Sequence, residues 1–233
     1  MKSYGQFCPI AKAAELFCER WTPLIVRDLA VGATRFSELQ RGVPLMSPTL
    51  LSRRLKQLEA EGIVERRRGP TGRSWTYHLT EAGHEFVPIV LSLGTWGQRW
   101  ARRELEEGEM DLGLLIWALE RGAKPDAFGE GRTVVRLEFT DQPQAKQHWW
   151  FVNENGQTEL CLNDPGHEVD LYLAVTLRDM ILIWRGDLSV AGAIDSGRLE
   201  VLGQASARRA LPKWLATATL AHIKSQRPDA KAA

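Results

Sequence analysis

One short segment, residues 47–62, constrains the fold of this chain more than any other. It opens on Ser47-Pro48, a side chain that can cap a helix followed by a proline suited to the first turn, and it closes on Gly62. Between these ends leucines recur four and then three residues apart, at Leu51, Leu55 and Leu58. Because this spacing puts them on one face of a helix, it predicts an amphipathic helix that runs to about Glu61.

The face opposite these leucines carries hydroxyl and cationic side chains, which are the types that donate to phosphates and base edges. They are Thr49, Ser52, Arg53 and Lys56. A merely solvated helix face would look similar. A short helix predicted over Arg35–Leu39 and a tight turn precede the segment, however, and together they predict a helix-turn-helix.

The charge of the chain supports the same interpretation. The net charge is only +1, but residues 41–80 hold 8 basic residues against 3 acidic ones. Residues 1–108 carry a net +4 and residues 109–233 a net −3. A local basic excess is what a surface facing phosphates needs.

A basic hairpin is predicted directly after the main helix. Residues 63–67 and 75–79 alternate as strands, and a turn-rich tip with Arg68 and Arg73 joins them. This order is typical of a winged helix, whose hairpin lies over or in the minor groove. Thr80 then caps a long helix whose apolar stripe exceeds what one small domain covers: Phe86, Ile89, Leu93, Trp96 and Trp100. We expect this helix and a first helix near Ile10–Phe17 to form a dimer seam.

Several ordered motifs in the first half closely resemble the HxlR-type regulators, a branch of the MarR-like winged-helix proteins. They are Cys8-Pro9, Arg20-Trp21-Thr22, Arg35–Leu39, Ser47–Leu55, Leu58–Val64 and Tyr77–Gly83. One departure is Glu19, where the family usually has glycine, and we interpret it as a local change near the first helical turn. The resemblance implies a homodimer that binds a pseudo-palindromic site in double-stranded DNA. We predict DNA contacts from Arg35, Ser47, Pro48, Thr49, Ser52, Arg53, Lys56, Arg68 and Arg73.

The second half predicts an α+β domain, so the chain is expected to have two domains, 1–108 and 109–233. Helices are predicted near Asp111–Arg121, Arg178–Arg185 and Ser189–Asp195, with a last one carrying Leu211, Trp214, Leu215 and Ala218 on one face. Strands are predicted at Val134–Thr140, Gln147–Asn153, Thr158–Asn163, Val169–Leu177 and Leu199–Leu202. The alternation in Val169–Leu177 is that of a half-buried antiparallel strand.

This second domain resembles the sterol-carrier-protein-like fold in Asp170–Leu173, Trp184–Gly186, Ala193–Gly203 and Leu211–Leu215. That resemblance implies an apolar cavity, which in some members binds lipids or acyl chains. One hypothesis is therefore a pocket for a lipid-like or other apolar molecule, lined by Trp149, Phe151, Leu160, Leu162, Leu171, Leu173, Trp184 and Trp214. The alternative is a structural domain that packs and binds nothing.

Three cysteines, Cys8, Cys18 and Cys161, are too few and too scattered for a disulfide scaffold or a zinc site. In some proteins of the HxlR type the cysteine equivalent to Cys8 senses oxidants or electrophiles, so Cys8 is a redox candidate. Lys12 would lie one turn away and favour its thiolate. A small buried residue is the other interpretation of Cys8, and Cys18 and Cys161 are expected to be packing residues.

An enzyme is the rival class, and the sequence argues against it. Five histidines are scattered without metal-ligand spacing, and no nucleophile elbow or phosphate-binding glycine loop is found. We therefore predict no catalytic residue, metal or cofactor. No apolar run reaches the length of a membrane span, and the start lacks the apolar stretch of a secretory signal, so we expect a cytoplasmic regulator.

Overall fold

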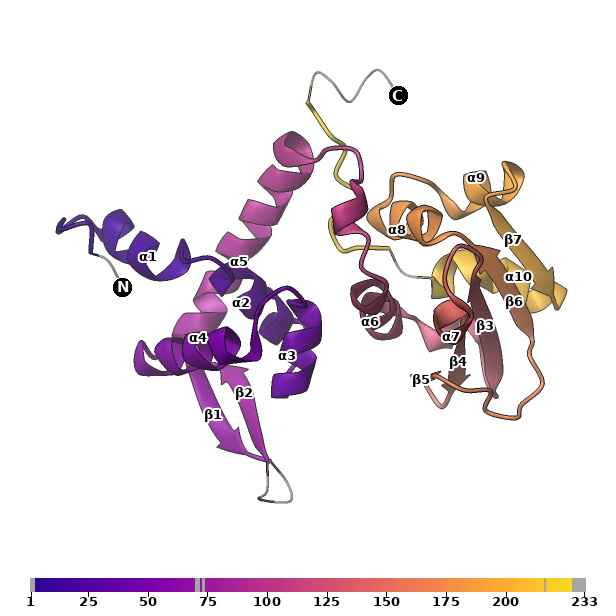
Figure 1. Ribbon diagram of the computed structural model, residues 1–233, viewed down its shortest axis with the longest axis horizontal. Helices are drawn as coiled ribbons and strands as arrows, with labels where there is room; N and C mark the ends of the chain where they lie inside the picture. The colour runs from indigo at the N-terminus through magenta and orange to yellow at the C-terminus, as the bar shows by residue number, and fades with distance from the viewer. Residues whose placement is uncertain (1–2, 70–71, 73, 216, 228–233) are drawn as a thin grey trace. The chain divides into compact units, whose positions relative to one another are not determined.

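A computed structural model describes residues 3–69, 72, 74–215 and 217–227 of the chain. The chain divides into two compact units, Met1–Trp96 and Gly97–Ala233. Both appear in Figure 1. The first unit ends at Trp96, whereas the sequence predicted a boundary after residue 108.

The first unit consists of five helices and a hairpin among its described residues. In chain order they are α1 (Pro9–Phe17), α2 (Thr22–Ala30), α3 (Phe36–Gly42), α4 (Pro48–Ala60), β1 (Val64–Arg68), β2 (Trp75–Leu79) and α5 (Glu81–Trp96). The strands pair antiparallel from Val64 opposite Leu79 to Arg68 opposite Trp75. This is the helix-turn-helix with a β-hairpin wing that the sequence predicted.

The leucine stripe of α4 forms the centre of the first core. Leu51, Leu55 and Leu58 are at most 1% exposed and share the interior with residues of α2 such as Ile25 and Val26. The start of α4 is capped as predicted, since the Leu50 amide donates to the Ser47 hydroxyl over 3.2 Å. The Tyr77 amide donates to the Thr34 carbonyl over 2.8 Å, which joins the hairpin to the chain just before α3.

The second unit is an α+β layer structure built on a five-stranded mixed sheet. Its strands are β3 (Thr133–Phe139), β4 (His148–Glu154), β5 (Gln157–Cys161), β6 (Leu171–Val175) and β7 (Leu199–Gly203), in the spatial order β5-β4-β3-β6-β7. Its longer helices are α6 (Leu112–Gly122), α8 (Leu177–Arg185) and α10 (Ala205–Trp214), with α7 (Gln144–Gln147) and α9 (Val190–Asp195) shorter. Short 3-10 turns lie at Glu107–Glu109 and Pro125–Phe128, and a π-helical turn spans Gly97–Ala101.

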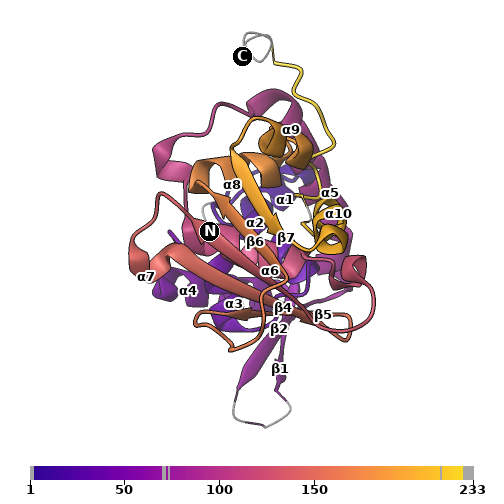
Figure 2. The ribbon, with the colours of Figure 1, turned by 90° about the vertical axis from the view of Figure 1, so that its right-hand side faces the viewer.

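One face of the sheet, whose strands are labelled in the ribbon of Figure 2, carries the core of the second unit. Side chains of β3, β4 and β6 meet residues of α6, α8 and α10 there, among them Phe151, Leu173 and Trp214. The opposite face carries Arg136, Trp150 and Tyr172, which follow the alternation of their strands. Among the described residues, no helix is both long and apolar enough to cross a bilayer.

Two expectations for this unit are wrong in detail. The strand β6 runs parallel to β3 and antiparallel to β7, rather than antiparallel throughout. Alternation reveals which face is buried but carries no information about the direction of a neighbour. The last helix ends at Trp214, so Ala218 lies beyond it, where its amide donates to the Trp184 carbonyl over 2.7 Å.

Candidate nucleic-acid interface

The outer face of α4 presents the residues expected to contact DNA. Ser47, Pro48, Thr49, Arg53 and Lys56 are exposed, and Ser52 is half-buried. Within the described part of the chain, the side chains of Arg53 and Lys56 form no ion pair or hydrogen bond, so both cations remain available to a ligand. All six residues therefore lie on α4 or at its N-cap, with their side chains wholly or partly exposed.

The turn between α3 and α4 is held by side chains of α3 and α2. The side-chain amide of Gln40, on α3, donates to the Met46 carbonyl over 2.6 Å, and this bond spans the turn. Arg27 Nη2 donates to the Gly42 carbonyl over 3.0 Å. A Cβ on Gly42 would lie 1.9 Å from Asp28 Oδ2, so only glycine lets α3 approach α2 this closely. The spacing of the helix-turn-helix is therefore fixed by packing.

Arg35 lies at the start of α3 and is exposed. Its backbone amide donates to Glu38 Oε2 over 2.9 Å, and its backbone bridges Thr76 of β2. Arg35 is thus anchored by its main chain where α3 meets the hairpin, while its side chain remains exposed.

The hairpin holds its arginines against a tryptophan, an arrangement that sequence reasoning missed. The guanidinium carbons of Arg66 and Arg68 each lie 4.2 Å from the ring centroid of Trp75. Arg68 Nη1 also donates to the Gly72 carbonyl over 3.1 Å, which ties it to the tip. Arg68 and Trp75 lie opposite each other in the hairpin, so the predicted pairing of the two strands was the signal that could have revealed this cation–π contact. Arg73, the second arginine predicted to contact DNA, lies outside the described residues.

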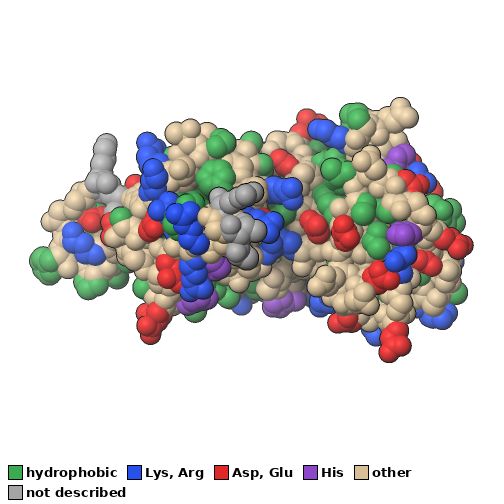
Figure 3. Space-filling model, turned by 90° about the horizontal axis from the view of Figure 1, so that it is seen from below, with side chains coloured by type: hydrophobic (Ala, Val, Ile, Leu, Met, Phe, Trp, Pro, Cys, Tyr) green, Lys and Arg blue, Asp and Glu red, His purple; other side chains and the backbone are tan. Residues whose placement is uncertain are grey.

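Basic side chains gather on the side of the first unit from which the hairpin projects. Figure 3 shows a band of Lys and Arg side chains there, viewed toward the hairpin tip. The exposed arginines of the hairpin, Arg66 and Arg68, and those of α3 and α4, Arg41 and Arg53, belong to this unit. A band of this sign would attract a polyanion.

The apolar stripe of α5 is largely exposed. Ile89, Leu93 and Trp96 are 55% to 58% exposed, which is unusual for such large apolar side chains. Trp100 follows in the π-helical turn at 45%. Phe86 is an exception to the predicted seam: it is 7% exposed and stacks on Phe17 of α1, with ring centroids 3.3 Å apart.

The three cysteines differ in their surroundings. Cys8 is half-buried at the N-cap of α1. Lys12 was expected to favour the Cys8 thiolate, but it pairs with Glu15, with Nζ 3.5 Å from Oε2. Cys18 is exposed, so its interpretation as a packing residue is wrong; it follows the last turn of α1. Burial, helped by the charge of Glu159, raises the pKa of the Cys161 thiol.

We therefore expect Cys161 to react with iodoacetamide more slowly than Cys18. A thiol with a raised pKa holds less thiolate at neutral pH, and the thiolate is the nucleophile. Timed alkylation at pH 7.5 followed by peptide mass spectrometry would measure both rates in one sample. Equal rates in the folded protein, with equal rates also in denaturant, would contradict this prediction.

The second unit does not gather all the residues of the predicted apolar pocket. Phe151, Leu171, Leu173 and Trp214 are core residues, and Trp149, Leu160 and Trp184 pack against them. Leu162 lies after the end of β5 and is 66% exposed, so it stands apart from this group. The apolar pocket stays a prediction.

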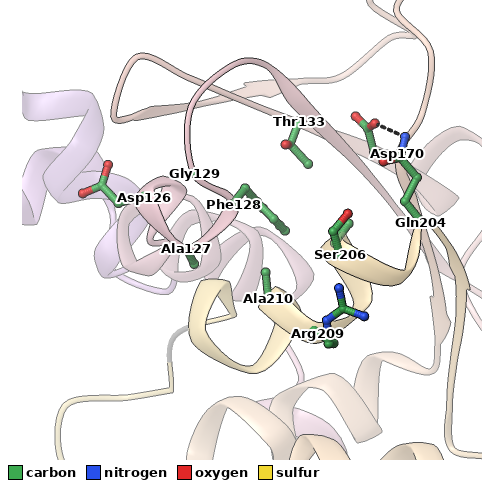
Figure 4. Close-up of a pocket in the computed structure, with 11 residues that line it drawn as sticks. Asp126, Ala127, Phe128, Gly129, Thr133, Asp170, Gln204, Ser206, Arg209 and Ala210 are labelled. Carbon is green, nitrogen blue, oxygen red and sulfur yellow. Dashed lines mark hydrogen bonds between the residues drawn. The ribbon is translucent and has the colours of Figure 1, made fainter.

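A different cavity, of about 400 Å³, opens beside the start of α10 (Figure 4). Its lining is mixed rather than apolar, with Asp126, Phe128, Thr133, Asp170, Ser206 and Arg209 among its residues. The carboxylate of Asp170 is already engaged, since it accepts from the Val134 amide and from Gln204 Nε2 over 2.8 and 2.9 Å. The cavity shares no residue with the predicted apolar pocket.

The geometry of the first unit defines a winged helix-turn-helix protein, and comparison with known proteins gives the family. Residues 16–105 match the model of the HxlR-like helix-turn-helix family. The chain is 39% identical over 98 residues to the HTH-type transcriptional regulator YvaP of Bacillus subtilis, covering 41% of this chain and 91% of the relative. It is 32% identical over 113 residues to YkvN of the same organism, covering 48% and 94%. The chain belongs to the HxlR-like family of transcriptional regulators.

A solved structure is also similar to part of the chain. The reduced form of the transcriptional regulator YodB from B. subtilis is 35% identical and covers 40% of this chain and 93% of its own, with a TM-score of 0.36. The family match covers residues 16–105, which are most of the first unit and the first residues of the second, so most of the second unit lies outside it. The likeness of the second unit to sterol-carrier-like proteins stays a prediction.

Proposed function

We propose that this protein regulates transcription as a homodimer that binds a pseudo-palindromic site in double-stranded DNA. Membership of the HxlR-like family supports DNA binding by the first unit. The observation that carries the finer proposal is the exposed face of α4, where Arg53 and Lys56 lie free of protein partners among the described residues. In this proposal α4 enters the major groove, and the arginines of the hairpin contact phosphates or the minor groove.

The dimer in this proposal is formed along α5. Its exposed Ile89, Leu93 and Trp96 would be covered by a second copy, together with α1, where Ile10 is 79% exposed. Exposed apolar stripes of this kind mark interaction sites. A twofold axis would place two α4 helices about 34 Å apart, one turn of DNA.

The first test is a selection of DNA by the full-length protein. We expect a random duplex library to yield a pseudo-palindromic sequence that is bound at least about 1,000-fold more tightly than its scrambled counterpart. Affinity should fall steeply with salt, because phosphate contacts release counterions. Selection of no sequence above the starting library would contradict the proposal, as would affinity independent of salt.

There are two candidates for the signal that changes DNA binding. One is an apolar ligand bound in the second unit. The other is oxidation of Cys8 or its reaction with an electrophile, in which case the second unit is purely structural. Cys8 is half-buried at the start of α1, so its thiol keeps the partial exposure that the second candidate requires. Native mass spectrometry of freshly purified protein separates them, since a lipid-sized adduct on the dimer supports the ligand. An empty dimer that releases DNA after mild peroxide, with Cys8→Ser resistant, supports the cysteine.

A further inference from the structure

One arginine of α4 faces inward, although its neighbours face solvent. Arg54 is only 8% exposed, and arginine is seldom buried unless it is paired. Its Nη2 donates to Glu19 Oε2 over 2.9 Å, and its Nη1 donates to Gln57 Oε1 over 2.8 Å. The guanidinium is thus neutralised by a carboxylate 35 residues earlier in the chain.

Glu19 lies in the turn that joins α1 to α2, and its backbone is anchored there. Its carbonyl accepts from the Thr22 amide over 3.1 Å, and Trp21 closes the turn with a φ of 81°, a conformation rare for a residue other than glycine. Through this turn, Glu19 connects α4 to α1, which itself stacks Phe17 on Phe86 of α5. The ion pair is therefore a link between the helix that faces DNA and the helices proposed to form the dimer.

The pair is built so that losing one partner is costly. Without Glu19 a nearly buried guanidinium would keep only the neutral Gln57 as a partner, and it would have to move toward water to be solvated. Arg54 is flanked on α4 by Arg53, and a helix turns about 100° per residue. A rotation that exposes Arg54 would therefore swing Arg53 away from its present direction.

We propose that Glu19 is a positioning residue for DNA recognition, which holds α4 in one orientation through Arg54. The inference rests on the proposed function, since it concerns the same face of α4. It also replaces the expectation that Glu19 is only a local change in the first helical turn, because its side chain reaches the helix that faces DNA.

Electrostatics alone and the proposal predict opposite changes in DNA affinity for the substitution of Glu19 by glutamine. Glu19→Gln removes a negative charge from a unit that binds a polyanion, so by charge alone it should tighten binding to any duplex. If the pair positions α4, affinity for the selected duplex falls instead. The matched control is Glu61→Gln, at the exposed end of α4, whose side chain has no ion pair or hydrogen bond among described residues.

We expect Glu19→Gln to lower affinity for the selected duplex by about fivefold, while affinity for the scrambled duplex stays equal or rises. Glu61→Gln should leave the ratio of the two affinities unchanged. Fluorescence anisotropy on both duplexes, at a temperature where circular dichroism shows each variant fully folded, measures this ratio. A loss of stability without a positioning role would leave the ratio at its wild-type value.

A double-mutant cycle tests the pair without relying on one variant. Adding Glu19→Gln to Arg54→Gln should reduce the affinity ratio no further than Arg54→Gln does alone, because the interaction is already absent. Independent losses from the two substitutions would overturn the inference, as would a wild-type ratio in Glu19→Gln. If the wild-type protein selects no duplex, the proposed function itself fails. If it selects a duplex and Glu19→Gln keeps the wild-type ratio, only this inference fails, so the two failures are distinguishable.

Discussion

Replacing Arg53 with alanine is expected to weaken binding to the selected duplex by about 1–3 kcal/mol and to relax discrimination at one position of the site. The side chain is exposed on the outer face of α4 and has no partner among the described residues, so it is free to reach base edges. Lys56 lies three residues later on the same exposed face. Lys56→Ala should instead weaken binding to all duplexes to a similar extent and reduce the salt slope by about one.

Gel shifts or anisotropy on the selected duplex, on single-base variants of it and on a scrambled duplex would measure both effects. The matched control is Arg208→Ala, which removes the same charge from an exposed side chain in the second unit. Wild-type affinity in both the Arg53 and Lys56 variants would refute the assignment of the α4 face. Equal, sequence-independent losses in the two variants would show that Arg53 contacts phosphate rather than bases.

Most of the first unit could be predicted because its signals are local. A capping serine with a proline, Ser47-Pro48, marks the start of α4, and the recurring leucines mark its buried face. Thr80 marks the start of α5 in the same way, since its hydroxyl accepts from the Gly83 amide over 3.2 Å. In each case the physical cause lies within a few residues, so a single sequence contains it.

The features that were missed depend on contacts between distant segments. The pairing of Glu19 with Arg54 joins positions that share no pattern, and the parallel neighbour of β6 follows a crossover through β4 and β5. The hypothesis of an apolar pocket assumed that large rings line a space. Trp214 shows why composition cannot decide this, because its ring is 2% exposed and its Nε1 donates to Asn153 over 2.7 Å.

Asn153 leads to the prediction with the largest expected effect on stability. It is 1% exposed on β4, and its amide nitrogen donates to the carbonyls of Thr133 and Phe151 over 3.0 and 3.2 Å. Its oxygen accepts from Trp214 Nε1 and, over 2.8 Å, from the Thr158 hydroxyl. One buried side chain thus satisfies polar groups of β3, β4, β5 and α10.

Asn153→Leu, which keeps the number of side-chain heavy atoms but removes the polar ones, should destabilise the second unit by about 3 kcal/mol, because it leaves the Trp214 indole without a partner in the core. Thermal unfolding should shift down by roughly 10 °C. Trp214→Phe should lower the free energy of unfolding by less, since Asn153 still accepts a hydrogen bond from the Thr158 hydroxyl. In the Asn153→Leu background the loss caused by Trp214→Phe should be smaller still, because the hydrogen bond between the two side chains is already absent. Calorimetry of these variants, with the exposed Asn163→Leu as control, measures the coupling; additive losses would show that the two residues stabilise the fold independently.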